Sequence, residues 1–383
     1  MERKSGAMTA PAVTETDTNT VARADGSRRL QRMGAVTMGV SLPREWVGHH
    51  GLGVGSPVFL EPLADGSILV RDRTREEQPR TAEIHVRTDR PREHLFRRLV
   101  AAYLDGAQEF HVLETGGLSP DTLSVARTFV RRTIQPEIVS EDGERLHLRD
   151  VSRGGELDVA PLLRRMHQIV QRLQEEASTS FAGSLRGPTD NWPARDDEVD
   201  RHAWLIERIL ALRAGSPGGG QASSFGAIPQ LFVIVRSLER VADHAVQIAE
   251  HGARWAETSP PARLVRSVSE FHTQARRLLA DSFRAAEVGD ADTANDLLDT
   301  GEALHAEYRT LVENTLTRRG GPALPGPGAI ELALVLQSID RTSAYAQDIA
   351  EAGLDSGVRG QLRGGSRPTS RSSTEERGGS RKR

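Results

Sequence analysis

The sequence contains no cysteine among its 383 residues, which excludes disulfide scaffolds, thiolate zinc sites, iron–sulfur clusters and cysteine nucleophiles. Lysine is almost as scarce. Lys4 and Lys382 are the only two, so a Schiff-base lysine or the lysine of a phosphate-binding P-loop is not expected. No run of about 18 apolar residues occurs, and the N-terminus lacks the apolar segment of a secretory signal. We therefore predict a cytoplasmic protein without membrane insertion.

The common enzyme motifs are also absent. The patterns G-x-S-x-G, H-E-x-x-H and G-x-x-x-x-G-K-[ST] do not occur, and the glycine run 218–220 is followed by Gln221 rather than by Lys-Ser or Lys-Thr. The formal charge of −3 is close to balance, so a nucleic-acid partner would have to be bound by a local patch. The sequence thus predicts a protein that is not an enzyme.

Composition and periodicity divide the chain into a multi-domain α+β protein with three folded blocks between two tails. Residues 1–26 and 356–383 lack apolar periodicity, and the second of these tails is basic, so both are predicted to be disordered. The first block, residues 27–73, alternates like short strands around one short helix beginning at Pro43. The second block, residues 81–150, is predicted as a small α+β domain with a sheet covered by two helices, and we interpret it as a structural or oligomerising spacer.

The third block, residues 156–355, is predicted to be entirely helical. Six periodic segments are separated by Gly/Pro clusters, and a Pro-Pro break divides them into three and three. When Arg240 is placed on Arg341, Ile248-Ala249-Glu250 coincides with Ile349-Ala350-Glu351. We therefore predict two three-helix repeats, residues 156–258 and 261–355.

Two carboxylate pairs stand at i, i+4 spacing in the first repeat: Asp196 with Asp200, and Glu239 with Asp243. Each pair projects from one face of its helix, where like charges repel. Carboxylates from facing helices are the ligands of bundle-core iron and manganese sites, and oxygen-only ligands suit iron, manganese or magnesium better than zinc. The alternative is a set of ordinary ion pairs with neighbouring arginines, because Arg236, Arg240, Arg195 and Arg201 flank the two pairs.

His202 and His244 lie beside these pairs but on a different helical face, so we do not count them as ligands. The second repeat lacks most of the acidic positions. Gly301 and His305 stand where Asp196 and Asp200 would be, and Ala344 stands where Asp243 would be. A complete cluster is therefore predicted in the first repeat alone.

Four arginines gather in the first block: Arg28, Arg29, Arg32 and Arg44. Arginines on a β-element can pair with phosphates or guanine edges in a groove of double-stranded DNA. The alternative is a solvated strand face. A block of under about 50 residues is too small to bury a good core by itself, so we expect it to form a homodimer.

The first block resembles the AbrB/SpoVT swapped-hairpin DNA-binding domain, through the segment from Ser27 to Val47 with its Leu42-Pro43-Arg44-Glu45-Trp46 step and through Gly51-Leu52-Gly53-Val54-Gly55. The resemblance implies intertwined dimers with Arg28, Arg32 and Arg44 on DNA, Arg29 being a further candidate. Ser56 stands where the family often has Asp, a departure that concerns turn stability more than DNA binding.

The helical block resembles PhoU, the phosphate-uptake regulator, through the segment Arg236-Ser237-Leu238-Glu239-Arg240-Val241-Ala242-Asp243-His244-Ala245. This resemblance implies metal binding by Asp196, Asp200, Glu239 and Asp243. In the second repeat only Asp340 matches the pattern. Proteins that join the two kinds of domain are common in archaea and carry a middle region of this kind.

Together these features predict a DNA-binding transcriptional regulator of phosphate uptake, with a helical body that senses phosphate status or contacts a phosphate ABC transporter or a phosphate-signalling protein. The alternative is an adaptor that does not bind DNA, negatively regulates the phosphate ABC transporter and uses its N-terminal domain only to dimerise. Affinity for DNA that falls steeply with salt and requires Arg28 and Arg44 would distinguish the first from the second.

Overall fold

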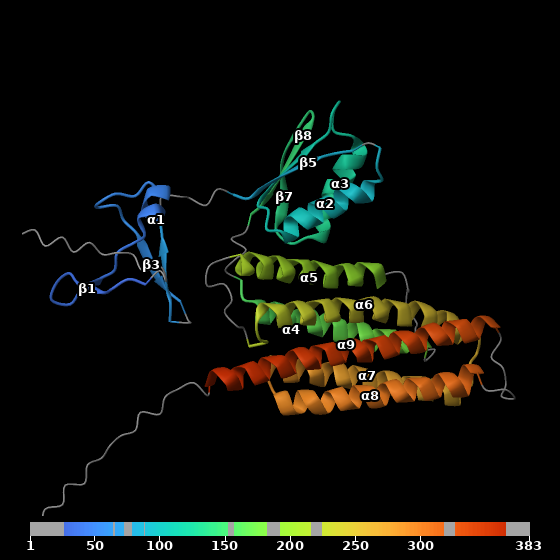
Figure 1. The fold of residues 1–383 in the computed structure, drawn as a ribbon. Coiled ribbons are helices and arrows are strands. Elements are labelled where there is room, and N and C mark those ends of the chain that lie inside the picture. Colours follow the sequence, from blue (N-terminus) through green and yellow to red (C-terminus); the bar gives the residue numbers. More distant parts are fainter. Residues whose placement is uncertain are drawn as a thin grey trace, which may run out of the picture. The chain divides into compact units, whose positions relative to one another are not determined.

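A computed structural model describes most of the chain, in eight stretches: residues 27–63, 66–72, 79–87, 89–151, 157–181, 192–215, 224–317 and 326–364. The chain divides into two compact units (Figure 1). The N-terminal unit is formed by Met1–Pro62 and Ile68–Glu76, and the C-terminal unit by Leu63–Ser67 and Glu77–Arg383. The two predicted tails fall largely outside the described residues, as does the turn at Ala64-Asp65.

The N-terminal unit consists of two small antiparallel hairpins and one short helix, with these bounds: β1 (Gln31–Arg32), β2 (Met38–Gly39), α1 (Arg44–His49), β3 (Phe59–Pro62) and β4 (Ile68–Arg71). The predicted short helix is present with strands before and after it, and the first two strands are only two residues long each. These strands pair only with each other, so they have no neighbouring strand to extend them.

No residue in the described part of the N-terminal unit is buried. Several of its apolar side chains are exposed, Met33 and Val36 by 74% and 95%, and others such as Trp46, Val47 and Leu52 are only partly buried. A single copy of this unit therefore has no hydrophobic core. The intertwined pair of hairpins predicted from the sequence is not present in one chain, and no swapped hairpin is seen.

The C-terminal unit begins with a four-stranded mixed sheet in the order β5-β6-β8-β7, formed by β5 (Thr81–His85), β6 (Glu109–Leu113), β7 (Pro136–Asp142) and β8 (Arg145–Asp150). β5 runs parallel to β6, and the other pairs are antiparallel. The helices α2 (Arg92–Leu104) and α3 (Pro120–Arg132) lie on the same face of the sheet (Figure 1). We call residues 79–151 the middle part; its elements match those predicted for 81–150.

The core of the middle part lies between the sheet and the two helices. An apolar stripe on α2 supplies Leu95, Leu99 and Tyr103, which are buried in one core with Phe110 of β6 and Phe129 of α3. Ser119 caps α3 by accepting a hydrogen bond from the Thr122 backbone N–H at 3.2 Å, directly before Pro120 in the first turn. The helical periodicity of apolar residues in the helices and their alternation in the strands thus account for a sheet covered by two helices.

Six long helices follow in the described residues and form the helical bundle: α4 (Val159–Phe181), α5 (Trp192–Ala214), α6 (Ile228–Glu257), α7 (Ala262–Val288), α8 (Ala291–Val312) and α9 (Gly326–Gly364). A π-helical turn, η2 (Glu313–Thr317), extends α8. α6 and α9 pack against each other, α4 and α5 flank α6, and α7 and α8 flank α9 (Figure 1). The predicted two three-helix repeats are therefore present.

One buried polar network joins the two repeats. Gln174 of α4 donates hydrogen bonds to the Val241 carbonyl at 2.9 Å and to Thr342 Oγ1 of α9 at 3.2 Å. His272 Nε2 of α7 lies 2.7 Å from Gln174 Oε1. Burial lowers the pKa of His272 to about 3, with the Arg276 charge as a smaller cause, so its ring stays neutral within the network. The network therefore connects α4 and α6 of the first repeat with α7 and α9 of the second.

The predicted start of the C-terminal tail at residue 356 is wrong, because α9 continues to Gly364. Its Gly and Ser residues are packing positions rather than signs of disorder. A Cβ on Gly357 would lie 2.5 Å from the Gly289 carbonyl oxygen, and Ser356 Oγ donates to the Phe225 carbonyl at 3.3 Å. Small residues are needed here because α9 passes close to the backbone that connects α7 with α8.

The middle part and the helical bundle have separate cores but form one compact unit. Arg208 of α5 is 1% exposed and donates to Asp150 Oδ2 at 2.6 Å and to the Ala107 carbonyl at 2.8 Å. It also donates to the Tyr103 carbonyl, and its guanidinium lies 4.7 Å from the Tyr103 ring centre. Removing one partner of such a buried pair costs about 3–5 kcal/mol, so this contact holds the two parts together.

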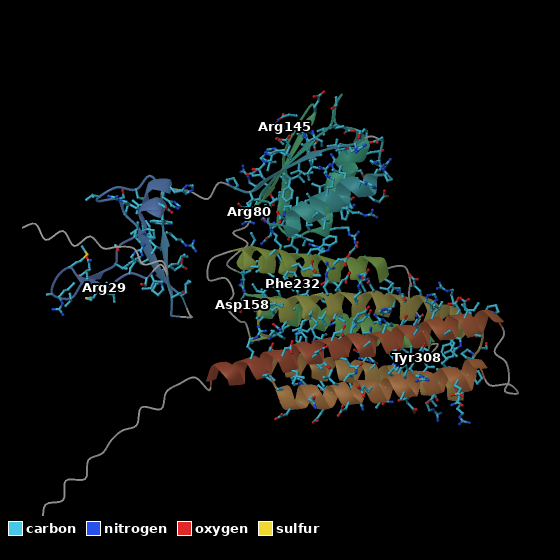
Figure 2. The ribbon with its side chains drawn as sticks, viewed as in Figure 1. Arg29, Arg80, Arg145, Asp158, Phe232 and Tyr308 are labelled. Atoms are coloured by element: carbon cyan, nitrogen blue, oxygen red, sulfur yellow. The ribbon has the colours of Figure 1, made fainter. Side chains whose placement is uncertain are left out.

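A second arginine, at the end of α3, also contacts residues of both the middle part and the helical bundle. Arg132, the last residue of α3, lies 5.6 Å from the ring centres of Phe96 and Trp204. Trp204 belongs to α5 and packs against the core of the middle part. Arg80, labelled in Figure 2, donates a hydrogen bond within the middle part, to the Asp105 carbonyl at the end of α2 at 3.2 Å.

No helix within the described residues is long and apolar enough to cross a membrane.

Candidate functional site

The four carboxylates selected from the sequence meet where α5 and α6 pack against each other. Asp196 and Asp200 lie one turn apart on α5, and Glu239 and Asp243 lie one turn apart on α6. All four are partly buried. We call them the acidic cluster. The spacing argument therefore placed both pairs on the faces that the two helices turn toward each other.

The charges of the acidic cluster act on one another across the helix contact. Burial raises the pKa of Asp196 to about 7, and the charges of the other three cluster carboxylates and of Asp197 contribute to the rise. Burial is also the first cause of the raised pKa values of Asp200, Glu239 and Asp243; the Asp243 charge adds to the rise in Asp200 and Glu239. Each raised pKa means that the protein environment disfavours the ionised form of that carboxylate.

Two arginines compensate part of this negative charge. Arg132 of the middle part donates to Asp200 Oδ2 at 2.9 Å and contacts Asp197 Oδ1 at 2.5 Å. Arg240 lies 3.4 Å from Asp243 Oδ2 and 3.5 Å from Glu239 Oε2. Among the described residues, however, the buried oxygen Asp196 Oδ1 has no hydrogen-bond partner. The predicted ion pairs with flanking arginines thus hold for Glu239 and Asp243 through Arg240, whereas Asp200 pairs with Arg132, which was not among the predicted arginines.

Two of the predicted flanking arginines pair with carboxylates outside the acidic cluster. Arg195 pairs with Glu176 of α4, and Arg236 pairs with Glu207 of α5 at 2.7 Å. Sequence reasoning missed Arg132, which is distant along the chain, and Glu207, whose pKa is raised by burial near the Asp200 charge. No local pattern indicates Arg132, because its approach depends on how the middle part docks on α5.

The donor chemistry of the acidic cluster fits a hard cation, since every donor is a carboxylate oxygen. The geometry is not that of an assembled chelate: in the part of the chain that is described, no three His, Asp or Glu side chains lie in position to hold a metal ion. The cluster is therefore a set of mutually repelling carboxylates whose nearest cations are Arg132 and Arg240.

The two histidines set aside in the sequence have other surroundings. His202 Nδ1 lies 2.7 Å from the Glu198 carbonyl oxygen, one turn earlier on α5. The ring of His244 lies 5.9 Å from the Tyr345 ring of α9. Burial lowers the pKa of His244 to about 4, with the charges of Arg341 and Arg240 as smaller causes, so the ring is neutral.

The second repeat has no acidic cluster at the equivalent positions. Asp340, which matches Glu239, lies 2.9 Å from His305 Nδ1, from which its carboxylate oxygen Oδ1 accepts a hydrogen bond. Gly301, which matches Asp196, is buried, and a Cβ there would lie 2.2 Å from Gln347 Cδ. Gln347 Nε2 donates to the Leu298 carbonyl at 3.0 Å. The space that an aspartate would need is thus filled by an amide.

The arginines predicted to contact DNA lie in the N-terminal unit, at the β1–β2 hairpin and the start of α1. Arg29, labelled in Figure 2, is exposed, as are Arg32 and Arg44, and Arg28 is partly exposed. Arg28 Nη1 donates to the Ser27 carbonyl at 3.0 Å. The arrangement leaves their charges accessible, as a solvated strand face also would.

Comparison with known proteins places a PhoU domain in the C-terminal half of the chain. Residues 163–251 match the family model of the PhoU domain, and this segment contains all four carboxylates of the acidic cluster. The comparisons give no support to an AbrB/SpoVT domain at residues 27–73. The match agrees with the prediction of a protein that is not an enzyme, since the curated relatives are named accessory proteins.

Two curated relatives are named phosphate-specific transport system accessory protein PhoU homolog. The one from Pseudomonas aeruginosa is 24% identical over 202 residues, covering 51% of this chain and 80% of the relative. The one from Pseudomonas putida is 23% identical over 190 residues, covering 49% and 72%.

Solved structures of PhoU show likenesses of similar extent. That of Pseudomonas aeruginosa has a TM-score of 0.48 at 21% identity and covers 53% of this chain and 96% of the other. That of Streptococcus pneumoniae has a TM-score of 0.46 at 17% identity and covers 52% and 94%.

Proposed function

We propose that this protein is a PhoU-type accessory regulator of a phosphate transport system, acting as an adaptor rather than as an enzyme. The observation that carries the proposal is the PhoU match over residues 163–251, which spans the acidic cluster. The names of the two Pseudomonas relatives support it, since both are accessory proteins of phosphate-specific transport. In this role the helical bundle contacts the transporter or its signalling partner.

The N-terminal unit serves, in this proposal, to dimerise the protein. In its described residues nothing is buried, and Leu30, Met33 and Leu60 are among its exposed apolar side chains. A second copy would give these side chains a partner and supply the core that one copy lacks. Binding to DNA through Arg28, Arg29, Arg32 and Arg44 stays a prediction without support from the comparisons.

Uptake of labelled phosphate by cells tests the adaptor against the DNA-binding regulator. In cells that lack this gene, we expect uptake in phosphate-rich medium to escape control, and the full chain to restore control. The double variant Arg28→Ala/Arg44→Ala should restore it equally well, because an adaptor does not need these charges. Restoration by the wild type but not by this variant would favour the DNA-binding regulator, and unchanged uptake in the deletion would refute both.

The acidic cluster is proposed to bind a hard cation such as iron, manganese or magnesium. The support is the mutual repulsion of four partly buried carboxylates together with the unpartnered Asp196 Oδ1. The cluster residues Asp196, Asp200, Glu239 and Asp243 would hold the ion, which would supply the positive charge that Arg132 and Arg240 provide only in part.

Calorimetric titration of the purified full chain with Mn²⁺ and with Mg²⁺ tests the cation site. We expect Asp196→Asn and Asp243→Asn each to weaken binding at least about tenfold, since a ligating charge is worth more than about 1.4 kcal/mol. Glu198→Gln is the matched control, because Glu198 lies on α5 but pairs with Arg165 at 3.3 Å. Equal weakening in the control, or no binding by the wild type, would refute the site.

A further inference from the structure

A cavity of about 300 Å³ lies in the middle part, remote in sequence from the acidic cluster. It opens where the parallel strands β5 and β6 end and where α2 and α3 begin, so His85, Glu114, Arg92 and Ser119 all line it. The carboxyl ends of parallel strands, followed by helix N-termini, are where α/β domains commonly place ligands. The site is separate from the transport role proposed above and does not rest on it.

The charge of the lining is positive. Four arginines contribute, against the two carboxylates Glu114 and Asp121, and the arginines are Arg87, Arg90, Arg92 and Arg98. Three of the four come from a six-residue stretch that leads into α2. A helix N-terminus carries a partial positive charge, so cations are unfavourable there and an anion is favoured by both the helix and the arginines.

The start of α2 leaves its backbone donors without a side-chain cap. Pro91 is the N-cap residue and has no side chain that can accept a hydrogen bond. The start of α3 is capped instead by the Ser119 hydroxyl, and the Ser119 backbone N–H donates to Glu114 Oε2 at 2.7 Å. Glu114 is thus engaged at α3, which leaves the α2 end of the cavity as the side where an anion finds open donors.

The arginines are placed so that a ligand can recruit them. Arg98 is anchored, since its Nη1 donates to the His85 carbonyl at 2.7 Å. Arg87 and Arg90 are held by Asp89, with contacts of 2.8 and 3.8 Å, and all three of these side chains are more than half exposed. Exposed ion pairs of this kind contribute little stability, so a ligand phosphate can replace Asp89 at small cost.

The rest of the lining is apolar. Val86, Leu95 and Val125 give the cavity a wall that an inorganic anion would not cover. Its volume lies at the lower end of the range for small-molecule sites, about 300–1,000 Å³. We propose that this cavity binds a phosphate monoester of a small organic molecule, with the phosphoryl group at the start of α2 among the arginines and the organic body against the apolar wall.

Isothermal titration calorimetry on the purified full chain tests the site. The probes are ribose 5-phosphate, glycerol 3-phosphate, orthophosphate, sulfate and citrate. We expect a phosphate ester to bind more tightly than the other three anions. Its affinity should fall at least about tenfold in Arg98→Ala and in Arg90→Ala, because each variant removes a charge-assisted hydrogen bond to the phosphoryl group.

Arg97→Ala is the matched control, because Arg97 neighbours Arg98 on α2, is exposed and does not line the cavity. Its affinity should stay within about twofold of the wild type. Arg90→Ala guards against misfolding of the Arg98 variant, since the Arg90 side chain is 52% exposed. The proposal is overturned if neither ester binds, if the two cavity variants bind as the wild type does, or if orthophosphate, sulfate or citrate binds as tightly as the esters.

Discussion

The two three-helix repeats share their packing but differ in their acidic positions. Gly252 in α6 and Gly353 in α9 occupy equivalent places, and both are buried where the third helix of a repeat approaches the first. The first repeat nevertheless gathers four carboxylates, whereas the second fills the matching space with Gln347 and pairs Asp340 with His305. The architecture is therefore maintained by small residues that are independent of the site, and the site can be lost from one repeat without changing the helices.

The largest expected effect tests the shared packing. A Cβ on Gly353 would lie 2.7 Å from the backbone Cα of Ala286, which cannot move aside, whereas one on Gly252 would meet the Ser180 hydroxyl at 2.3 Å. We expect Gly353→Ala to lower the free energy of unfolding by about 2 kcal/mol and Gly252→Ala by about 1 kcal/mol, because overpacking outweighs the gain in helix propensity. Urea denaturation followed by circular dichroism measures both, and equal losses would contradict the ranking.

A second variant asks whether the second repeat can regain an acidic position. Gly301→Asp would have to displace the Gln347 side chain and break its hydrogen bond to the Leu298 carbonyl. We expect a loss of about 2 kcal/mol in unfolding free energy, from overpacking and from burial of a charge. The double variant Gly301→Asp/Gln347→Ala should recover at least half of the loss. Failure to recover would show that something other than Gln347 fills the space.

A third variant concerns the pH dependence of the first repeat. Because burial raises the pKa of Asp196 to about 7, the folded chain keeps a proton there that the unfolded chain loses above about pH 4. The native aspartate therefore lowers stability progressively as the pH rises from about 4 to 7, with no further change above. Asp196→Asn removes this penalty, so it should gain stability over the wild type as the pH rises through that window.

The gain should reach about 1 kcal/mol at pH 8, after allowance for solvent screening of a partly exposed carboxylate, and should be small at pH 4.5. Urea titrations at the two pH values in the presence of a chelator measure it. Glu198→Gln on the same helix, which removes a carboxylate outside the acidic cluster, is the control. A constant difference between Asp196→Asn and the wild type would contradict the prediction.

The smallest expected effect concerns Arg240, which pairs with two carboxylates of the acidic cluster in the first repeat. Arg240 would compete with the proposed cation for Glu239 and Asp243, and its side chain is 54% exposed. Arg240→Ala should therefore raise the affinity for Mn²⁺ by about two- to fivefold, which corresponds to the worth of an exposed ion pair. Arg254→Ala on the same helix is the control, since Arg254 pairs with Glu331 at 3.1 Å. An unchanged affinity in Arg240→Ala would show that the arginine does not compete.

Periodicity predicted the helices and strands of the C-terminal unit well, because each carries its own apolar stripe or alternation. It also selected the four carboxylates, since i, i+4 spacing fixes which side chains share a helical face. The end of α9 was missed because Ser356 and Gly357 resemble a flexible tail in composition, and only the neighbouring helix shows why they must be small. Arg132 was missed for a related reason, since a contact between two separate parts of the chain leaves no local pattern.

The buried position of Arg208 has a consequence for how this chain can be divided. Its partners Asp150, Tyr103 and Ala107 all belong to the middle part. A fragment beginning after residue 156 would therefore expose Arg208 without its hydrogen-bond partners, and would also expose Trp204, which packs against the core of the middle part. The smallest piece that keeps its own contacts therefore runs from residue 79 to residue 364. A recombination event that moves the helical bundle, or a truncated variant made in the laboratory, would therefore have to include the sheet of the middle part together with the helices.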